Sequence, residues 1–138
     1  MSLKNELKLK KGFRSLEHET VLNIYYTASY IKKGAADLFR KIGLTDVQFN
    51  VLMLLYYQSN EHGALSQAEI SDMMLVNRAN VTTLIDRMEK AGLVVRTDLA
   101  DDRRFKLIKL TSEGKKLFEK AEPLYAEFIH NIVSSVKK

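Results

Sequence analysis

The amino-acid sequence predicts a mainly helical α+β fold that contains one small antiparallel β-unit. Apolar residues recur at steps of three and four over most of the chain, which is the period of an α-helix. Two short runs, residues 93–97 and 105–110, instead have the composition of β-strands. The 138 residues include one proline and six glycines, so few positions interrupt the predicted helices.

Residues 16–42 are predicted to form one long helix. Its apolar positions are Val21, Leu22, Ile24, Tyr25, Tyr26, Ala28, Tyr30, Ile31, Ala35, Leu38 and Ile42. This apolar stripe is too wide for a simple surface helix, so the helix is expected to be buried on two sides. Gly34 is expected to permit close packing of a neighbouring element.

Capping sequences mark the start of the next helices. The segments 45–48 and 66–69 are capping boxes, in which the hydroxyl of the N-cap residue and a side chain three residues later satisfy free backbone N–H groups. They open predicted helices over residues 46–59 and from residue 67 to 73 or 74. Asn77 is predicted to cap a fourth helix, over residues 78–91, that ends at Gly92.

The period changes after this fourth helix. The two predicted strands, residues 93–97 and 105–110, are joined by a loop of acids and arginines at residues 98–104. Thr111 is predicted to cap a final helix, which Pro123 is expected to kink because proline lacks a backbone donor. This order of elements is that of a winged helix-turn-helix with a long helix at each end.

Composition excludes several classes of function. The chain has no cysteine, which excludes a disulfide scaffold, a thiolate zinc site and a cysteine nucleophile. No apolar run approaches the roughly 18 residues of a membrane span, and the charged first residues are unlike a signal peptide. A cytoplasmic location is therefore expected. No phosphate-binding loop, nucleophile elbow or obvious carboxylate pair is present, so neither enzymatic activity nor a cofactor is expected.

The charge distribution indicates an anionic partner. The formal net charge is +5, with a net +4 over residues 1–14, −3 over residues 15–76 and +3 over residues 77–110. A basic latter half favours an anionic partner for one face of the molecule. A solvated surface with a basic tail is the alternative interpretation.

The helix predicted over residues 78–91 divides into an apolar face and a polar face. The apolar positions, expected to point inward, are Val81, Leu84, Ile85 and Met88. The outer face carries Arg78, Ala79, Thr82, Thr83 and Asp86, with Asn80 and Arg87 at its margins. Small polar side chains let a helix approach base edges in the major groove, where they can form hydrogen bonds. An ordinary amphipathic helix with a solvated face is the alternative.

The predicted hairpin adds a second feature that is typical of DNA binding. Asp102, Arg103 and Arg104 lie between the strands, where an arginine at a hairpin tip suits the negative potential of a narrow minor groove. Asp102 can orient one guanidinium group by a bidentate pair. The alternative is a simple surface salt bridge.

Taken together, these segments resemble the MarR family of winged helix-turn-helix transcription regulators. Residues 77–94 resemble the recognition helix of that family, and residues 65–70 resemble the helix before it. Residues 101–104 and 110–114 resemble the wing and the start of the next helix. The resemblance extends over residues 15–133.

The resemblance implies a homodimeric transcription regulator, usually a repressor, that binds double-stranded DNA at a pseudo-palindromic operator. One domain over residues 1–138 would comprise dimerisation helices at 15–42 and 112–138 and a DNA-binding lobe at 45–111. The predicted DNA contacts are Ser66, Asn77, Arg78, Ala79, Asn80, Thr82, Thr83, Arg87, Asp102, Arg103 and Arg104. Asp86 is interpreted as a member of a structural ion pair. Ala79 and Thr83 depart from the serine and arginine that are frequent in the family.

The two end helices carry more apolar residues than one small domain can bury, which favours a two-fold interface. The predicted interface residues are Tyr25, Leu124, Tyr125, Phe128, Ile129, Ile132 and Val133. Packing of the two helices within one chain is the alternative.

The resemblance further implies a small aromatic or anionic effector. Its predicted contacts are Arg14, Tyr26, Tyr30, Phe39, Phe49 and His62, although the same aromatic spacing is also typical of a packed core. The absence of cysteine excludes the thiol-based peroxide sensing that occurs in the family. Three scattered histidines predict no metal site.

A winged helix that docks on another protein is the alternative function. That function would favour an apolar or acidic outer face on the fourth helix, whereas the sequence places arginine, asparagine and threonine there. The sequence therefore favours DNA.

Overall fold

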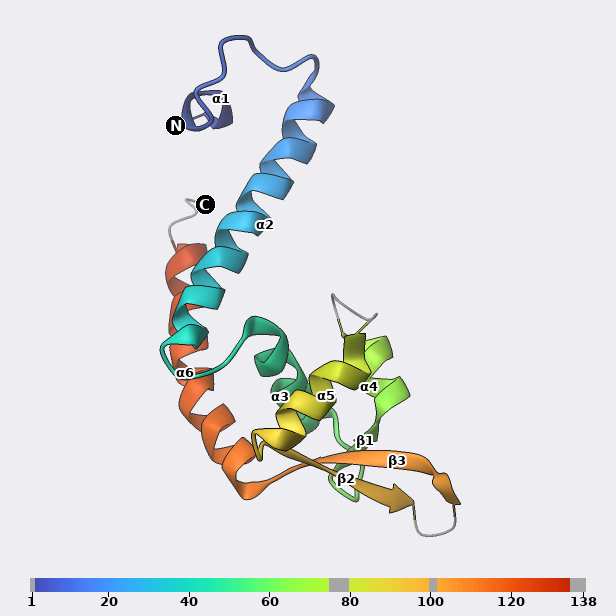
Figure 1. The fold of residues 1–138 in the computed structure, drawn as a ribbon. Helices are drawn as coiled ribbons and strands as arrows, with labels where there is room; N and C mark the ends of the chain where they lie inside the picture. The colour runs from blue at the N-terminus through green and yellow to red at the C-terminus, as the bar shows by residue number, and fades with distance from the viewer. Residues whose placement is uncertain (1, 75–79, 100–101, 135–138) are drawn as a thin grey trace.

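The computed structural model describes residues 2–74, 80–99 and 102–134, with only the backbone described for Leu99 and residues 102–105. Its elements are α1 (Leu3–Glu6), α2 (Leu16–Arg40), α3 (Asp46–Gln58), β1 (Ala64–Ser66), α4 (Gln67–Met73), α5 (Val81–Lys90), β2 (Val94–Leu99), β3 (Asp102–Leu110) and α6 (Ser112–Ser134). The predicted mainly helical fold with a β-wing is confirmed. Helix α2 projects from a lobe formed by α3, α4, α5 and the sheet, and α6 lies beside its C-terminal half (Figure 1).

The helix caps agree with the local sequence. The backbone N–H of Gln48 donates to the Thr45 hydroxyl, and the Gln48 side chain accepts from the backbone of Thr45, both at 3.1 Å. Gly114 N–H donates to the Thr111 hydroxyl at 3.0 Å, so Thr111 caps α6 as predicted. Helix α5 begins later than expected, because Asn80 occupies its N-cap position; the predicted cap Asn77 lies outside the described residues.

The sheet has three strands rather than the predicted two. Its antiparallel order is β1-β3-β2, and buried Leu65 in β1 lies opposite buried Ile108 in β3. Three residues are too few to show a strand period in the sequence. Strand β1 therefore depends on a pairing partner that lies far along the chain.

The predicted loop over residues 98–104 is largely strand. Strand β2 continues to Leu99 and β3 begins at Asp102, so the prediction of a long loop was wrong. Asp98 lies opposite Lys106 in the register, and the two side chains form an ion pair. Opposite charges across the ladder stabilise strands whose polar composition resembles that of a loop.

The core joins the lobe to the C-terminal half of α2. Its largest fully buried side chains are Phe39, Phe118, Leu52, Ile70, Met74, Ile85, Met88, Ile108, Val51 and Val94. Two glycines permit close approaches: a Cβ on Gly34 would lie 2.8 Å from the Phe128 ring, and one on Gly114 would overlap the backbone carbonyl of Leu93. The expectation for Gly34 is confirmed.

The first half of α2 differs from expectation. Leu16, Val21, Ile24 and Tyr25 are between 50% and 76% exposed, because this half of the helix extends beyond the lobe. The prediction that α2 is buried on two sides is therefore wrong for the single chain. Among the described helices, none combines the length and the apolar character needed to cross a membrane.

Two tyrosines of α3 are hydrogen-bonded to glutamates of α6. The Tyr56 hydroxyl donates to Glu119 at 3.1 Å, and the Tyr57 hydroxyl donates to Glu122. These hydrogen bonds, reinforced by the negative charge of the carboxylates, raise the pKa of both phenols above their ordinary value. They help to hold α3, a helix of the lobe, against α6.

Candidate nucleic-acid interface

Helix α5 presents the predicted polar face to solvent. Val81, Ile85 and Met88 are buried, and Leu84 is half-buried, as expected for the inward stripe. Thr82 and Thr83 lie on the opposite side and are exposed. The amphipathic division of this helix therefore follows the periodicity of its sequence.

The exposed face of α5 continues into a groove at the start of α3. The residues that line this groove are Thr45, Asp46, Val47, Asn80, Thr83, Leu84 and Arg87. It brings together three of the predicted DNA contacts, Asn80, Thr83 and Arg87, from two successive turns of one helix and its N-cap. Helix α3 adds its N-terminal end, where the Thr45 hydroxyl and the Asp46 carboxylate accept from the backbone N–H groups of Gln48 and Val47.

Ser66 lies at the N-cap of α4, the helix that precedes α5. Its hydroxyl accepts from the backbone N–H of Glu69 at 3.1 Å, and the Glu69 carboxylate accepts from the backbone N–H of Ser66 at 2.7 Å. The hydroxyl proton of Ser66 remains available to donate to an acceptor such as a phosphate oxygen. The predicted contact at Ser66 is therefore chemically consistent with its role as a cap.

Arg96 ties the recognition helix to the wing. Its guanidinium group lies 2.6 Å from the Asp86 carboxylate and 3.1 Å from the Glu89 carboxylate, both on α5. The backbone N–H of Arg96 also donates to Glu89 at 2.9 Å. The interpretation of Asp86 as a structural ion-pair residue is confirmed, whereas sequence reasoning missed Arg96 itself.

Six of the predicted DNA contacts lie wholly or partly outside the described residues. Asn77, Arg78 and Ala79 lie outside the described residues. The backbones of Asp102, Arg103 and Arg104 belong to β3 instead of a loop, and their side chains lie outside the description. These six residues, like the other predicted DNA contacts, remain predictions from the sequence.

The six predicted effector contacts lie in different places within the protomer. Phe39 and Phe49 are buried and stack with ring centroids 4.4 Å apart, so both contribute to the core. Tyr26 and Tyr30 line a cavity between α2 and α6, whereas His62 lies by another cavity after α3. Arg14 is exposed before α2. Together these positions do not form one pocket in the single chain.

Tyr26 makes a contact that the sequence did not predict. Its hydroxyl donates to the Glu6 carboxylate of α1 at 2.9 Å, and this hydrogen bond raises the pKa of the Tyr26 phenol. The alternative interpretation of the charge distribution placed the residues of α1 in a basic tail. Leu3 is instead buried and Ser2 caps the short helix, so at least residues 2–6 have a defined place in the fold.

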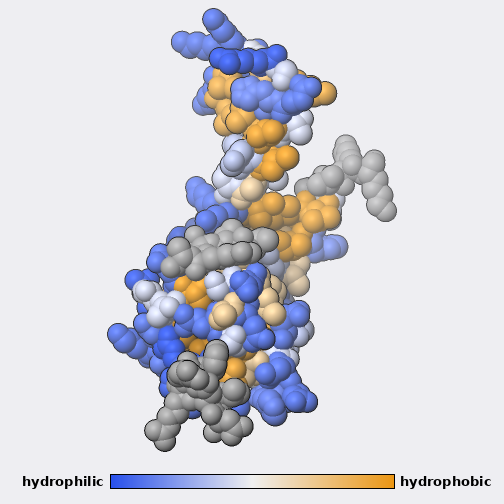
Figure 2. Space-filling model, turned by 90° about the vertical axis from the view of Figure 1, so that its right-hand side faces the viewer, coloured by the Kyte–Doolittle hydropathy of each residue, from blue (hydrophilic) through white to orange (hydrophobic). Residues whose placement is uncertain are grey.

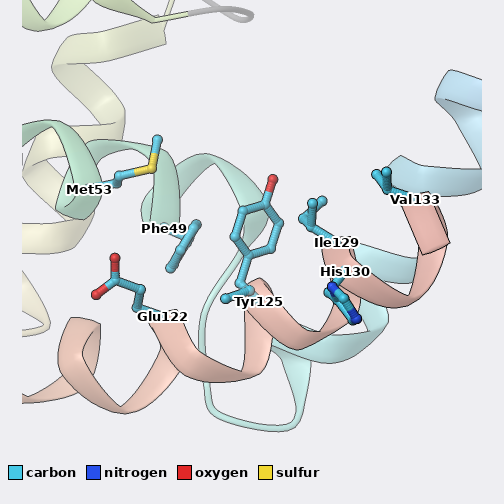
Figure 3. A pocket seen from close by; sticks show the side chains of 8 residues that line it. Phe49, Met53, Glu122, Tyr125, Ile129, His130 and Val133 are labelled. Carbon is cyan, nitrogen blue, oxygen red and sulfur yellow. The ribbon is translucent and has the colours of Figure 1, made fainter.

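A different cavity lies between the lobe and α6. It has a volume of about 540 Å³ and is lined by Phe49, Met53, Glu122, Tyr125, Ala126, Ile129, His130 and Val133. Figure 3 shows the Tyr125 ring between Phe49 of α3 and Ile129 of α6. Most of its lining is apolar, with one carboxylate and one imidazole at the edges. Among the residues that the structure describes, no group of three metal-ligating side chains is found.

The predicted dimer residues differ in their burial. Tyr25, Leu124 and Val133 are exposed, at 72%, 37% and 61%. Tyr125 and Phe128 are half-buried and pack against the core of their own chain. Hydrophobic surface is visible on the projecting part of the molecule (Figure 2).

Comparisons with known proteins agree with the winged helix-turn-helix fold. The family model described as "MarR family" matches residues 42–104. The HTH-type transcriptional repressor MdtR of Bacillus subtilis is 39% identical over 109 residues, which are 79% of this chain and 68% of that protein. The organic hydroperoxide resistance transcriptional regulator of the same organism is 30% identical over 106 residues, which are 77% of this chain and 69% of that protein.

A solved structure supports the fold, and other relatives show how much of their length this chain spans. The crystal structure of Sco3205, a MarR family transcriptional regulator from Streptomyces coelicolor in complex with DNA, has a TM-score of 0.79 at 20% identity. That match covers 94% of this chain and 81% of the other. Against HTH-type regulators from Bacillus subtilis, Escherichia coli and Neisseria gonorrhoeae, this chain spans only 58%, 50% and 53% of the relative's length. The matches that cover more than two thirds of a relative, together with the fold, show that the chain belongs to the MarR family.

Proposed function

We propose that this chain is a sequence-specific transcription regulator that binds double-stranded DNA as a homodimer. The observation that carries the proposal is the exposed polar face of α5. This helix lies beside the wing, and Arg96 of β2 connects the two by its ion pairs with α5. An α-helix fits the major groove, and Thr82 and Thr83 are small enough for close approach to base edges. A repressor role is supported by the relative named a transcriptional repressor.

Arg87 is proposed to contact a phosphate. It is exposed, it lies in the groove shared by α5 and the start of α3, and the described residues form no ion pair with it. Asn80 and Thr83, in the same groove, would then face the bases next to that phosphate.

The homodimer is supported by apolar surface that the protomer leaves exposed. Leu16, Val21, Ile24 and Tyr25 on α2 and Val133 on α6 are each at least 50% exposed. Apolar side chains gathered on one projecting part of a molecule favour association. A two-fold copy would cover them and would place two recognition helices about 34–36 Å apart, which matches one turn of DNA.

A small aromatic effector is proposed for the cavity between α3 and α6. Its volume of about 540 Å³ lies in the range of small-molecule sites. Helix α3 belongs to the DNA-binding lobe and α6 to the proposed dimerisation unit. A molecule that binds one arrangement of these helices more tightly would shift the distance between the two recognition helices. A thiol signal is excluded because the sequence has no cysteine.

Selection of bound sequences from a random duplex library tests the proposal. Purified protein at physiological salt with nonspecific competitor is expected to enrich an inverted repeat whose half-sites are about 10 base pairs apart. Folded protein that enriches no sequence would overturn the proposal. It would favour the docking of this winged helix on another protein.

A substitution at Arg87 tests the predicted phosphate contact. Arg87→Ala is expected to weaken binding to all sequences and to lower the slope of log affinity against log salt by about one per protomer. Lys33→Ala, which removes an exposed positive charge from α2, is the control and should leave the slope unchanged. A change in base preference at an unchanged slope would instead assign Arg87 to base recognition.

A further inference from the structure

A glutamine of the preceding helix forms a hydrogen bond with Thr82. Gln67 is the first residue of α4, and its side-chain Nε2 donates to the Thr82 hydroxyl of α5 at 2.5 Å. Gln67 is half-buried and Thr82 is exposed. The hydrogen bond therefore joins the two helices of the helix-turn-helix at the edge of the proposed DNA-binding face.

This hydrogen bond determines which way the Thr82 hydroxyl can act. A threonine hydroxyl has one proton to donate and two lone pairs that accept. One lone pair accepts from Gln67, and none of the described residues accepts the proton, so the proton can donate to a third group. The Thr82 carbonyl also accepts from Arg96 at 3.5 Å. Thr82 is therefore hydrogen-bonded to a residue of α4 and to a residue of β2.

Gln67 retains hydrogen-bonding capacity of its own. One of its two amide protons is used by Thr82, and its other N–H and its carbonyl oxygen have no partner among the described residues. In the major groove, adenine offers the N7 acceptor and the N6 amino donor side by side. The glutamine N–H and carbonyl oxygen, with the threonine proton as a further donor, therefore complement the acceptor and donor of adenine. Guanine offers two acceptors, thymine one acceptor and cytosine one donor, so none of them pairs with both groups of the glutamine.

We propose that Gln67 is a specificity-determining residue of this protein. Its hydrogen bond to Thr82 leaves the Thr82 hydroxyl proton to donate toward DNA. The two side chains together recognise one base pair and prefer adenine at that position. This inference rests on the proposed function. It adds to the recognition surface a residue of α4 that the sequence analysis did not include among the DNA contacts.

The test compares the sequences selected by four proteins: the unmodified chain, Gln67→Ala, Thr82→Val and the double variant. Each single substitution is expected to reduce the preference for adenine at the same position by roughly tenfold, the discrimination that one good base contact supplies. The double variant should lose little more than either single variant, because residues that act as a unit are not additive. Gln58→Ala, an exposed glutamine at the end of α3, is the matched control.

Gln67→Glu distinguishes base reading from simple support of the helix. A carboxylate can only accept, so Thr82 would donate its proton to it and would present lone pairs to the DNA. The two helices would stay joined, but the hydroxyl would accept a hydrogen bond from the base instead of donating one. Adenine preference should therefore fall at least as far as in Gln67→Ala, with an unchanged thermal unfolding midpoint. Preservation of the preference would overturn the inference.

The remaining outcomes separate this inference from the proposed function. If the unmodified chain enriches a motif and Gln67→Ala enriches the same one, the inference alone is wrong. Additive losses at two different positions would show that Gln67 and Thr82 act independently, which also refutes it. If the folded, unmodified chain enriches nothing, the proposed function fails and the inference falls with it. Thr82→Ser, which retains the hydroxyl, should keep the preference.

Discussion

Replacing Arg96 with methionine is expected to destabilise the fold and to loosen the wing from the recognition helix. The guanidinium group lies 2.6 Å from Asp86 and 3.1 Å from Glu89, and its side chain is only 20% exposed. The two carboxylates are 49% and 40% exposed, so water can solvate them again once the arginine is gone. Methionine keeps most of the apolar stem, which isolates the loss of the charged group.

The size of the effect follows from these exposures. Partly exposed ion pairs contribute up to about 1 kcal/mol each, and hydrogen bonds to charged groups somewhat more, so the loss should be about 1–2 kcal/mol. For a domain of this size, that corresponds to a fall in the unfolding midpoint of roughly 3–10 °C. Arg40→Met is the control, because the Arg40–Asp37 pair is 74% and 50% exposed and should contribute less than about 0.5 kcal/mol.

Thermal unfolding followed by circular dichroism measures the first effect, and salt-dependent DNA binding measures the second. Arg96→Met should lower the affinity for a selected duplex while leaving the salt slope unchanged, because Arg96 is neutralised by the protein's own carboxylates. Equal destabilisation by Arg96→Met and Arg40→Met would refute the role of this network in stability. A slope lowered by one would instead mean that Arg96 contacts a phosphate.

Three further perturbations test the packing and the tyrosine contacts. Gly114→Ala should cost about 3 kcal/mol or more in denaturant unfolding, because its Cβ would overlap the backbone of Leu93, which cannot rotate away. Gly34→Ala should cost less than about 2 kcal/mol, since the Phe128 ring can turn and alanine favours a helix; a larger loss than at Gly114 would contradict this comparison. The raised pKa of Tyr57 means that its contribution to stability is fully present below pH 10.0, the ordinary phenol value, and is lost as the pH rises through the folded-state pKa. Tyr57→Phe should therefore make unfolding less sensitive to pH in that alkaline range, and an unchanged pH dependence would refute the assignment.

Local features of this protein follow from residues that are close in sequence. The capping boxes at Thr45 and Ser66 formed as predicted because each involves groups three residues apart. The buried stripe Val81, Ile85 and Met88 also formed as predicted, since a helical period determines which residues share a face. Together with the two runs of strand composition, these signals were sufficient to predict the winged helix-turn-helix and the exposed face of its recognition helix.

The contacts between elements depended on the tertiary structure. Strand β1 exists because Leu65 meets Ile108, and Arg96 serves the recognition helix because β2 lies along α5. The hydrogen bond from Gln67 to Thr82 likewise requires α4 and α5 to cross at one angle. No local period encodes such pairs, since their free energy arises only when packing of the core brings distant segments together. The sequence by itself therefore determined the capped starts of α3, α4 and α6 and the buried face of α5, whereas the tertiary structure decided which polar side chains hold the recognition surface in place.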